Sequence, residues 1–439
     1  MDSLNGKKQE IIRLPRDVRR VGHVRWWIAW TLFFSTVTNY ISRQTFSVLS
    51  PVLAAQYHFS HADIARILGA FQMSYAVTWL LGGIFLDTFG TRLGLALAVS
   101  FWSFVNLVTG FANSGFGFAA SRFLLGAGEG FNWPGASKTV AEWFPNDERG
   151  IAVAIFDSGS SVGGALAAMI IPWIAIAFGW RWSFVFSGAL GFIWVVTWLY
   201  MYFPLDKHPR VTQPEVALIR AGQETFPRTG GSAIRKWLAL AKSRNVWGIV
   251  LGRALTDPIW WFYVFWLPQY LSDARGFSLK RIAMFAWLPF IAADLGNFTG
   301  GWVSRYCIRY GIPVIRTRMW ICVISCFPIL AGIPAALVHN TYAALGLICV
   351  ALWGYASWST MGLTLPSDLF PQEIVATVTG LSGFAAGMVS TVFTLAVGFL
   401  VDRFSYTPAF LVAGLMPLVA TTCLLCLITP PRDKVVVIE

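Results

Sequence analysis

Charged residues are scarce in this sequence. Only 12% of its 439 residues are Asp, Glu, Lys or Arg, whereas 56% are hydrophobic. A soluble globular domain usually carries about 25% charged residues. A soluble core of this size cannot absorb so much apolar surface, so we expect the bilayer to be the solvent. The 16% of aromatic residues, with 22 Trp, fit rings that gather at membrane interfaces.

Histidine and cysteine are also few. The histidines all fall in predicted tails or loops, which argues against haem, a metalloprotease and a His-based proton relay: they are His23, His58, His61, His208 and His339. The six cysteines all lie in the second half and show no disulfide or metal spacing, so we interpret them as buried thiols. We therefore expect no metal and no cofactor. No nucleophile–base pair stands out either, which argues against an enzyme.

The apolar residues form about twelve runs of ~20 residues, each long enough to cross a bilayer. Several runs contain Gly or Pro, which membrane helices tolerate. The predicted spans are 26–48, 64–85, 93–112, 116–140, 151–178, 184–203, 246–271, 282–303, 319–338, 342–365, 374–401 and 409–428. The fold class is thus an all-α membrane protein with twelve transmembrane helices.

Lys and Arg predict the orientation. Twenty-four of them lie on one side of the predicted membrane and six on the other, which places the richer side in the cytoplasm. The net charge of +12 lies in short segments between the spans, so it does not indicate nucleic-acid binding. The predicted parts are a basic cytoplasmic tail, a six-helix half, a cytoplasmic linker, a second six-helix half and a second cytoplasmic tail: 1–25, 26–203, 204–244, 245–428 and 429–439.

The two halves have similar residues at matching positions. Residues 143–145 (Trp-Phe-Pro) match residues 369–371 (Leu-Phe-Pro) at an offset of 226 positions, and the same offset aligns further residues. Two similar six-helix halves, related by pseudo-symmetry and joined by a cytoplasmic loop, are the usual plan of a rocking transporter.

A short loop follows the second predicted span. In it, Gly83 allows close helix packing, Asp87 can face a helix N-terminus, Gly90 permits a tight turn, and Arg92 supplies a cytoplasmic charge. The segment 83–92 resembles the gating-loop signature of the major facilitator superfamily. Its counterpart in the second half, 300–305, lacks the acid. The motif concerns gating and does not identify a substrate.

Ionisable side chains inside a span are costly unless they are paired or hydrated, so each is a functional candidate. In the fourth span, Arg122, Gly126 and Glu129 share one helix face, and the two charged residues lie roughly 10 Å apart along the axis. A guanidinium matches a carboxylate with two hydrogen bonds. A carboxylate near the midplane is costly to keep charged, so Glu129 could accept and release a proton. The alternative is a structural ion pair.

Polar residues of the first two spans extend this candidate site. Tyr40 and Arg43 are one turn apart, as are Gln72 and Tyr75. Tyrosine hydroxyls in such a cavity would suit a polyhydroxylated ligand. The alternative for the tyrosines is a packed or interfacial ring.

The second half contributes further charges. Arg253 and Asp257 stand at i, i+4 and are expected to pair, and Pro258 should kink or break the helix there. This pair is either part of a substrate site or a brace between helices. Asp294 either braces the second half or relays protons. Asp157, two turns into the fifth span, is interpreted as structural.

Longer runs carry a more specific resemblance, which extends over nearly the whole chain. The chain resembles the bacterial hexuronate permeases of the anion:cation symporter family. The resemblance rests on Arg43 and on the segments 122–129, 142–145, 148–149, 151–153, 159–163, 282–289, 293–296, 367–370 and 375–377. The resemblance implies proton-coupled uptake of galacturonate or glucuronate across the bacterial cytoplasmic (inner) membrane, driven by the proton gradient without a cofactor. It implies a monomer in the bilayer whose partners are a sugar-acid anion and protons.

The resemblance also assigns roles to residues. It implies that Arg43 and Arg122 bind the substrate anion, that Glu129 takes part in proton coupling, and that Tyr40 and Tyr75 contact the substrate. Aldonate-transporting members have an Asp before the first-span Arg, where this sequence has Ser42.

Aldonate carriers also have a Gln where this sequence has Ser160, and Gly383 lacks an amide side chain. These departures favour hexuronates and leave the proton count open. One alternative is symport of an aldonate, aldarate, aromatic or dicarboxylic acid. Another is a membrane sensor or a membrane-embedded enzyme. The linker is too short for an ordinary signalling domain, and no catalytic group of residues appears within the spans.

Overall fold

The structure is a computed structural model that describes residues 22–145, 148–221, 242–370 and 372–429. All regular elements of the described residues are helices, which confirms the predicted fold class. The first half contains α1 (Val24–Tyr57), α2 (His61–Thr109), α3 (Gly115–Glu129), α4 (Asn132–Trp143), α5 (Arg149–Phe178) and α6 (Trp180–Met201). The second contains α9 (Arg244–Asp273), α10 (Leu279–Phe285), α11 (Leu288–Arg309), α12 (Val314–Ile329), α13 (Gly332–Leu337), α14 (Thr341–Leu369), α15 (Gln372–Arg403) and α16 (Thr407–Leu427).

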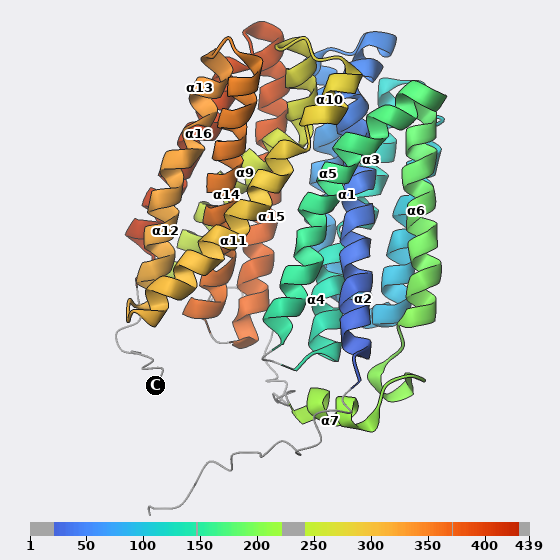
Figure 1. Ribbon diagram of the computed structural model, residues 1–439, viewed down its shortest axis with the longest axis vertical. Coiled ribbons are helices and arrows are strands. Elements are labelled where there is room, and N and C mark those ends of the chain that lie inside the picture. Colours follow the sequence, from blue (N-terminus) through green and yellow to red (C-terminus); the bar gives the residue numbers. More distant parts are fainter. Residues whose placement is uncertain (1–21, 146–147, 222–241, 371, 430–439) are drawn as a thin grey trace, which may run out of the picture.

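The two groups of helices stand side by side (Figure 1). Between them in the chain lie a short 3-10 helix, η2 (Leu205–Lys207), and α7 (Gln213–Ala221), which sits beneath the first group. We call this end of the molecule the linker end, and the opposite end the far end. The outer parts of the predicted tails, 1–21 and 430–439, and residues 222–241 of the predicted linker lie outside the described residues.

Each predicted span coincides with one helix or with consecutive helices. The second and third spans are joined in α2, whose backbone leaves the helical region at Gly90. The fourth, eighth and ninth spans, which we predicted as unbroken, are each interrupted: α3 is followed by α4, α10 by α11, and α12 by α13. Of the predicted kink or break at Pro258, the break does not occur, because α9 continues through Pro258 and Pro268, and the kink stays a prediction. Neighbouring helices can supply the lost packing and polar contacts in a membrane protein.

Three spans differ from the rest in composition. Nine helices among the described residues are long and apolar enough to cross a membrane. The predicted first, fourth and seventh spans, which are α1, α3 with α4, and α9, do not meet that criterion. They carry the charged residues of the candidate site, and α1 is buried without a gap from Ser35 to Ser50. The faces of these helices that carry the charged residues therefore point to the interior, where protein rather than lipid surrounds them.

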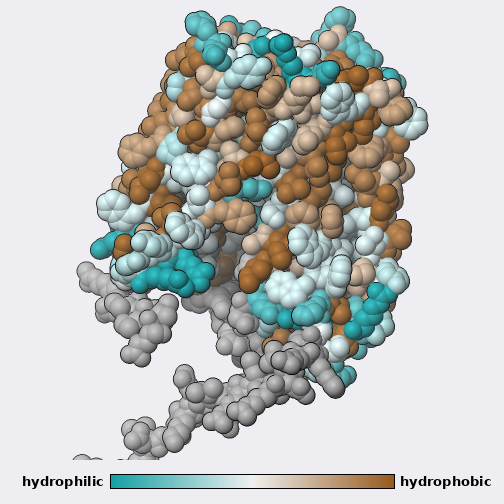
Figure 2. Space-filling view, in the orientation of Figure 1, coloured by the Kyte–Doolittle hydropathy of each residue, from teal (hydrophilic) through white to brown (hydrophobic). Residues whose placement is uncertain are grey.

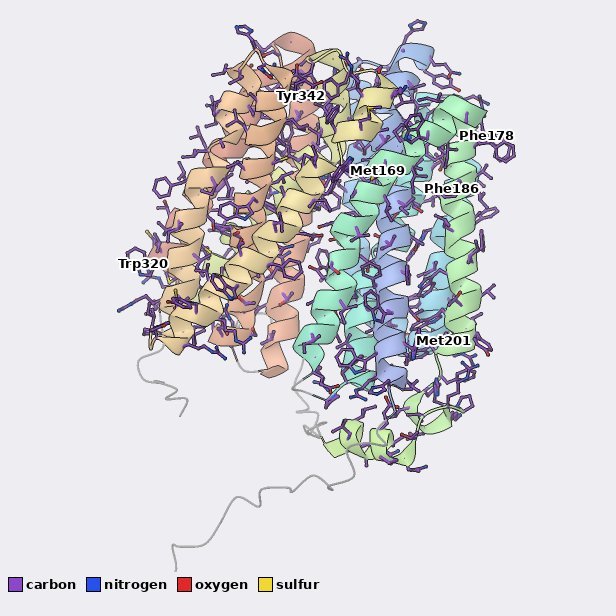
Figure 3. The ribbon with its side chains drawn as sticks, in the orientation of Figure 1. Met169, Phe178, Phe186, Met201, Trp320 and Tyr342 are labelled. Atoms are coloured by element: carbon purple, nitrogen blue, oxygen red, sulfur yellow. The ribbon has the colours of Figure 1, made fainter. Side chains whose placement is uncertain are left out.

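The outer surface has the opposite character. On the face shown in Figure 2, hydrophobic residues cover the middle of the molecule and hydrophilic residues gather toward both ends. Large apolar side chains are exposed on the outer surface (Figure 3), among them Phe178, Trp320 and Tyr342, which are 72%, 60% and 61% exposed. Since water would penalise such a surface, this apolar surface is the face that meets lipid. The protein is a multi-pass membrane protein.

The predicted gating loop connects several helices. Gly90 has φ 72° and ψ 159°, a region that is essentially restricted to glycine. The guanidinium of Arg92 donates to the Leu199 carbonyl oxygen at 2.6 Å and lies over the Phe203 ring at 4.0 Å. Thr91 donates to Glu142 of α4 at 2.8 Å. Arg92 thus ties α2 to the end of α6. The side chain of Asp87 and the surroundings of Gly83 lie outside the described residues.

The linker end is held together by ion pairs. Arg25, at the start of α1, contacts Glu148 at 2.7 Å and Glu215 of α7 at 3.1 Å. Glu215 is fully buried. These pairs fix α7 against the beginnings of α1 and α5. The first described residue, Gly22, donates its backbone N–H to Thr212, so it lies at this end as well.

Gly90 provides a test of the turn. Replacing Gly90 by Ala should lower the free energy of unfolding by about 1–3 kcal/mol, because a Cβ atom is strained at this φ and ψ. The matched control is Gly301→Ala in α11, where an added Cβ meets no atom within 4 Å. Thermal unfolding in detergent, followed by tryptophan fluorescence, measures both variants. Equal stability of Gly90→Ala and wild type would contradict the conclusion that the backbone at position 90 requires glycine.

Candidate functional site

The centre of the first half holds a buried ion pair between α1 and α3. Arg43 donates from Nε to Oε2 of Glu129 at 3.0 Å, and the two side chains are 1% and 0% exposed. The Arg43 Nη2 group donates to Oδ1 of Asn39, one turn earlier in α1, at 2.9 Å. Desolvated charges are stable only when paired and hydrogen-bonded. The pair therefore fixes the position of both side chains.

Aromatic rings surround the Arg43 guanidinium. Its Cζ atom lies 4.5 Å from the ring centroid of Tyr40, 4.7 Å from that of Tyr75 and 5.1 Å from that of Trp261. Such cation–π contacts are worth more where water is excluded. Tyr40 and Tyr75 come from α1 and α2, whereas Trp261 belongs to α9 of the second half. Both halves therefore contribute to the site.

Arg122 lies beside this pair but is less completely bonded. It is fully buried, and its Nη2 group donates to the backbone carbonyl oxygen of Arg43 at 2.9 Å. Its Cζ lies 4.8 Å from the Phe71 ring centroid. The Nε and Nη1 atoms have no hydrogen-bond partner among the described residues. Two donors of a buried guanidinium thus remain available to an acceptor.

A glycine brings Arg122 and Glu129 against α2. A Cβ atom added to Gly126 would lie 2.3 Å from the Phe71 carbonyl oxygen, so no larger residue fits at this crossing. Gly126 stands between the two charged residues in α3. The predicted shared face of α3 therefore packs on the part of α2 that carries Phe71, Gln72 and Tyr75.

Several other buried polar atoms of α1, α2 and α3 also lack hydrogen-bond partners among the described residues. Both amide atoms of Gln72 and Oε1 of Glu129 are in this state. The others on α1 are Asn39 Nδ2, Ser42 Oγ, Gln44 Oε1 and Ser47 Oγ. Buried polar groups are normally bonded to protein or water. A concentration of such groups is typical of a site that binds a polar ligand.

The second half supplies two tryptophans that sequence reasoning missed. Trp260 Nε1 donates to the Tyr40 hydroxyl at 3.4 Å, and its ring stacks on Tyr355 with a centroid distance of 5.9 Å. Trp261 lies over Arg43, as described above. The sequence contained a signal, because tryptophans in the middle of a span, rather than at its ends, depart from the usual interfacial position.

The predicted pair in the seventh span is present. Arg253 contacts Asp257 at 2.9 Å and donates to Ser382 of α15 at 3.1 Å. Its Cζ lies 6.0 Å from the Trp79 ring centroid, and Trp79 packs against Tyr75. Arg253 therefore braces α9 against α15 and also adjoins the aromatic residues of the site. Its substrate role stays a prediction.

Two other candidates lie outside this group of contacts. Asp294 of α11 and Ser160 of α5 are both half-buried. Neither is among the described residues that contact Arg43 or Glu129. The alternative of an ion pair within α3 is not what the described residues hold: Glu129 bonds to Arg43 of α1, while Arg122 bonds to the α1 backbone. The spacing of residues along one helix shows which of them share a face, but it cannot show which neighbouring helix supplies their hydrogen-bond partners.

No group of three or more metal-ligating side chains occurs in the part of the chain that the structure describes. The arrangement instead offers two guanidinium groups, one carboxylate, two tyrosine hydroxyls and amide groups in a buried site between the halves. Such a site can bind an anion and exchange a proton without making or breaking other bonds.

The Arg43–Glu129 pair predicts a non-additive stability effect. Arg43→Met should destabilise the protein by about 3 kcal/mol, because Glu129 is then buried without its partner. The double variant Arg43→Met/Glu129→Gln should lose clearly less than the sum of the two single variants. Thermal unfolding of all four proteins measures the coupling. Additive losses would show that the two side chains do not stabilise each other.

Comparison with known proteins shows which family has this sequence pattern and fold. Residues 32–394 match the family model of the Major Facilitator Superfamily. The chain is 33% identical over 406 residues to the hexuronate transporter of Escherichia coli K12, covering 91% of this chain and 93% of that protein. It is 34% identical over 295 residues to the galacturonate transporter of Dickeya chrysanthemi, covering 66% of this chain and 84% of that protein.

The fold agrees with these sequence matches. A bacterial homologue of the human lysosomal transporter Spinster, solved in an inward-facing and occupied conformation, superposes with a TM-score of 0.68 at 17% identity, covering 92% of this chain and 95% of that one. The predicted resemblance to hexuronate permeases is therefore confirmed at the level of family. The chain belongs to the major facilitator superfamily, and it is a membrane transporter and not an enzyme.

Proposed function

We propose that this protein imports hexuronates, galacturonate or glucuronate, together with protons by alternating access. The observation that carries the proposal is the buried group of Arg43, Glu129 and Arg122, in which two donors of Arg122 have no partner among the described residues. The relatives reported above, which are named as hexuronate and galacturonate transporters, support an organic acid as the substrate.

The chemistry of the site matches a sugar acid in two respects. The buried guanidinium of Arg122, whose Nε and Nη1 groups have no partner among the described residues, can bind a carboxylate through charge-assisted hydrogen bonds. The hydroxyl-rich ring of a hexuronate can bond to the Gln72 amide and the Tyr40 and Tyr75 hydroxyls, and its C–H faces can pack on Trp261. The side chain of Ser42 adds a small polar group where aldonate carriers have an acid.

Competition for Arg43 explains how proton and anion binding can be coupled. An ionised Glu129 occupies Arg43, and it competes electrostatically with an incoming carboxylate. When Glu129 takes up a proton, its attraction for Arg43 falls, so the substrate anion can replace it. Release of the proton would restore the Arg43–Glu129 pair and expel the anion. The two ligands therefore favour the same state of the site, as symport requires.

Alternating access would move the two halves about this central site. The distribution of Lys and Arg assigns the linker end, with both termini, to the cytoplasm. Hydrogen bonds between the halves lie at the site and toward the far end, such as Tyr40 with Trp260 and Ser50 with Gln269. This arrangement is that of a carrier closed toward the periplasm. We propose a monomer in the inner membrane that uses the proton gradient and no cofactor.

A second candidate is symport of another organic anion, such as an aldonate, aldarate, aromatic or dicarboxylic acid. The same arginines would bind any of these carboxylates. The discriminating feature is the wall of tyrosine and amide groups, which suits a hydroxylated ring better than an aromatic one.

Transport in proteoliposomes tests the substrate. With the outside more acidic, we expect uptake of radiolabelled galacturonate or glucuronate at least about tenfold above the rate without a gradient, since each pH unit contributes about 1.4 kcal/mol per coupled proton. Unlabelled hexuronates should compete better than aldonates, aldarates or benzoate. Absence of gradient-stimulated uptake of either hexuronate would refute the proposal, and stronger competition by another acid would favour the second candidate.

Glu129 provides a separate test of coupling. Glu129→Gln should abolish accumulation driven by the gradient but retain binding or exchange, because the amide cannot release a proton while the arginines remain. The control is Asp206→Asn, in an exposed ion pair with Arg220 outside the spans, which should leave uptake unchanged. Undiminished accumulation by Glu129→Gln would remove Glu129 from the coupling role.

A further inference from the structure

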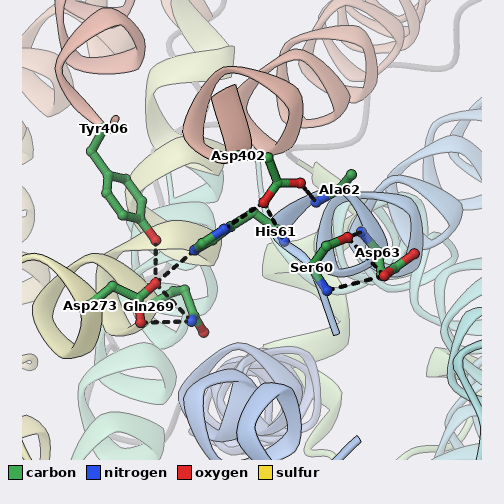
Figure 4. Close-up of polar contacts among 8 residues, drawn as sticks. All are labelled: Ser60, His61, Ala62, Asp63, Gln269, Asp273, Asp402 and Tyr406. Carbon is green, nitrogen blue, oxygen red and sulfur yellow. Dashed lines mark hydrogen bonds and ion pairs between the residues drawn. The ribbon is translucent and has the colours of Figure 1, made fainter. Parts of the chain in front are cut away.

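A histidine connects the two halves at the far end of the molecule (Figure 4). His61 is the first residue of α2, and its ring contacts two carboxylates of the second half. Nδ1 lies 2.7 Å from Oδ1 of Asp402, near the end of α15, and Nε2 lies 2.8 Å from Oδ2 of Asp273, at the end of α9. The sequence predicts a tail or loop at this histidine, whereas the residue begins α2.

The two contacts define the protonation state that the arrangement needs. A neutral imidazole has one N–H group and one acceptor nitrogen, whereas the imidazolium donates from both nitrogens. Both partners of His61 are carboxylates, which accept when ionised. The two hydrogen bonds therefore exist together with ionised partners only when His61 carries a proton on each nitrogen. The His61 side chain is 27% exposed, so protons from the solution at the far end can reach it.

The second half holds the Asp273 carboxylate in place without help from His61. Gln269 donates to both oxygens of Asp273 at 3.0 and 2.9 Å, and the Tyr406 hydroxyl donates to Oδ2 at 2.9 Å. Gln269 in turn accepts a hydrogen bond from Ser50 of α1 at 2.9 Å. The acceptor for His61 is thus a preset feature of the second half.

Asp402 also contacts the backbone of α2. Its oxygens accept from the backbone N–H groups of His61 at 3.0 Å and Ala62 at 2.8 Å. A carboxylate at a helix N-terminus satisfies free N–H groups and interacts favourably with the helix dipole. This part of the contact does not depend on the charge of His61, so it persists when the imidazole is neutral.

The other charged groups near His61 have partners of their own. On α2, Asp63 accepts from the Ser60 backbone and hydroxyl and contacts Arg66 at 2.7 Å. On the second half, Arg403 lies over Phe399. Beyond α9, Arg275 donates to Tyr270 and to the backbone of α13. Asp273, Asp402 and Tyr406 are therefore the titratable groups that bond directly to the histidine or to its partners.

Close packing makes these bonds specific to a closed far end. A Cβ atom added to Gly398 of α15 would lie 2.4 Å from Cβ of Ala65 and 2.7 Å from the His61 carbonyl oxygen. The His61 ring also lies against the buried Trp266, with centroids 6.5 Å apart. Helices α2 and α15 are thus in direct contact where Asp402 meets His61. Separation of the halves at this end would break every one of these contacts.

We propose that His61 is a proton-dependent latch of the far-end gate: its imidazolium holds the carboxylates of Asp273 and Asp402 across the two halves, and loss of one proton releases one of them. The latch closes in acid and loosens as the pH rises. Because the predicted orientation places this end in the periplasm, the same external proton that drives uptake would also favour closure behind the substrate. The latch rests on the transporter fold and not on the identity of the substrate.

Distance measurements between spin labels test the latch without any substrate. Labels at Phe178→Cys of the first half and Tyr342→Cys of the second report on the far end, where both exposed side chains lie (Figure 3). The four cysteines that are not fully buried, Cys307, Cys349, Cys423 and Cys426, are first replaced by Ser. We expect the long-distance, open population relative to the closed one to rise at least about fivefold between pH 5 and pH 8.

Variants separate His61 from other titrating groups. His61→Asn keeps a donor for one carboxylate but cannot take up a proton, so the pH dependence should disappear and the open population at pH 5 should rise. Asp273→Asn should also raise the open population at pH 5, with His61 left in place. The matched control is His339→Asn, an exposed histidine of the second half, which should behave like the parent protein.

Several results would overturn the latch. One is an unchanged ratio of open to closed populations in the labelled parent protein between pH 5 and pH 8, which needs no substitution at His61, Asp273 or Asp402. Another is a full pH response in His61→Asn. Because the measurement uses no hexuronate, a negative transport assay would leave this outcome unaffected, and a failure of the latch would leave the transport proposal standing.

Discussion

A hydrocarbon bilayer offers no hydrogen-bond partner to a charged side chain, and this constraint organises the interior of the protein. Arg43 is buried at the centre of the first half, so every part of its guanidinium must meet protein. Glu129 and Asn39 accept its hydrogen bonds, and aromatic rings cover its faces. The close crossing of α3 on α2 at Gly126 is part of the same packing, which holds Glu129 within hydrogen-bond distance of Arg43 on α1.

The same constraint explains why the functional helices are the least hydrophobic ones. Helices α1, α3 with α4, and α9 carry the charged residues, and the packing of neighbouring helices buries Arg43, Arg122 and Glu129 away from lipid. Arg122 is one of the buried groups that this packing leaves incompletely bonded, because its Nε and Nη1 atoms lack a partner among the described residues. A fully bonded Arg122 would stabilise the fold more and would have less to offer a ligand. Stability at this position is therefore exchanged for binding capacity.

Much of the architecture follows from local composition, which is why the sequence predicted it. The length of the hydrophobic runs, the charged residues within them and the Arg253–Asp257 pair all depend on residues that are close together in the chain. Partners on different helices could not be predicted in this way. The bond from Arg43 to Glu129, the contribution of Trp260 and Trp261, and the contacts of His61 each depend on how distant helices pack. The continuous helix at Pro258 shows that tertiary contacts can also override a strong local signal.

The attachment of α7 has a mechanical consequence. Since Arg25 and Glu215 fix α7 to the first half, only the 22 residues between Ala221 and Arg244 join the halves covalently. Fully extended, such a segment reaches about 75 Å, far more than the separation that a rocking motion needs. A covalent segment of this length does not by itself limit how far the halves can separate. The noncovalent contacts between the halves oppose that separation, so small changes of charge at the interface can decide which side of the membrane the carrier faces.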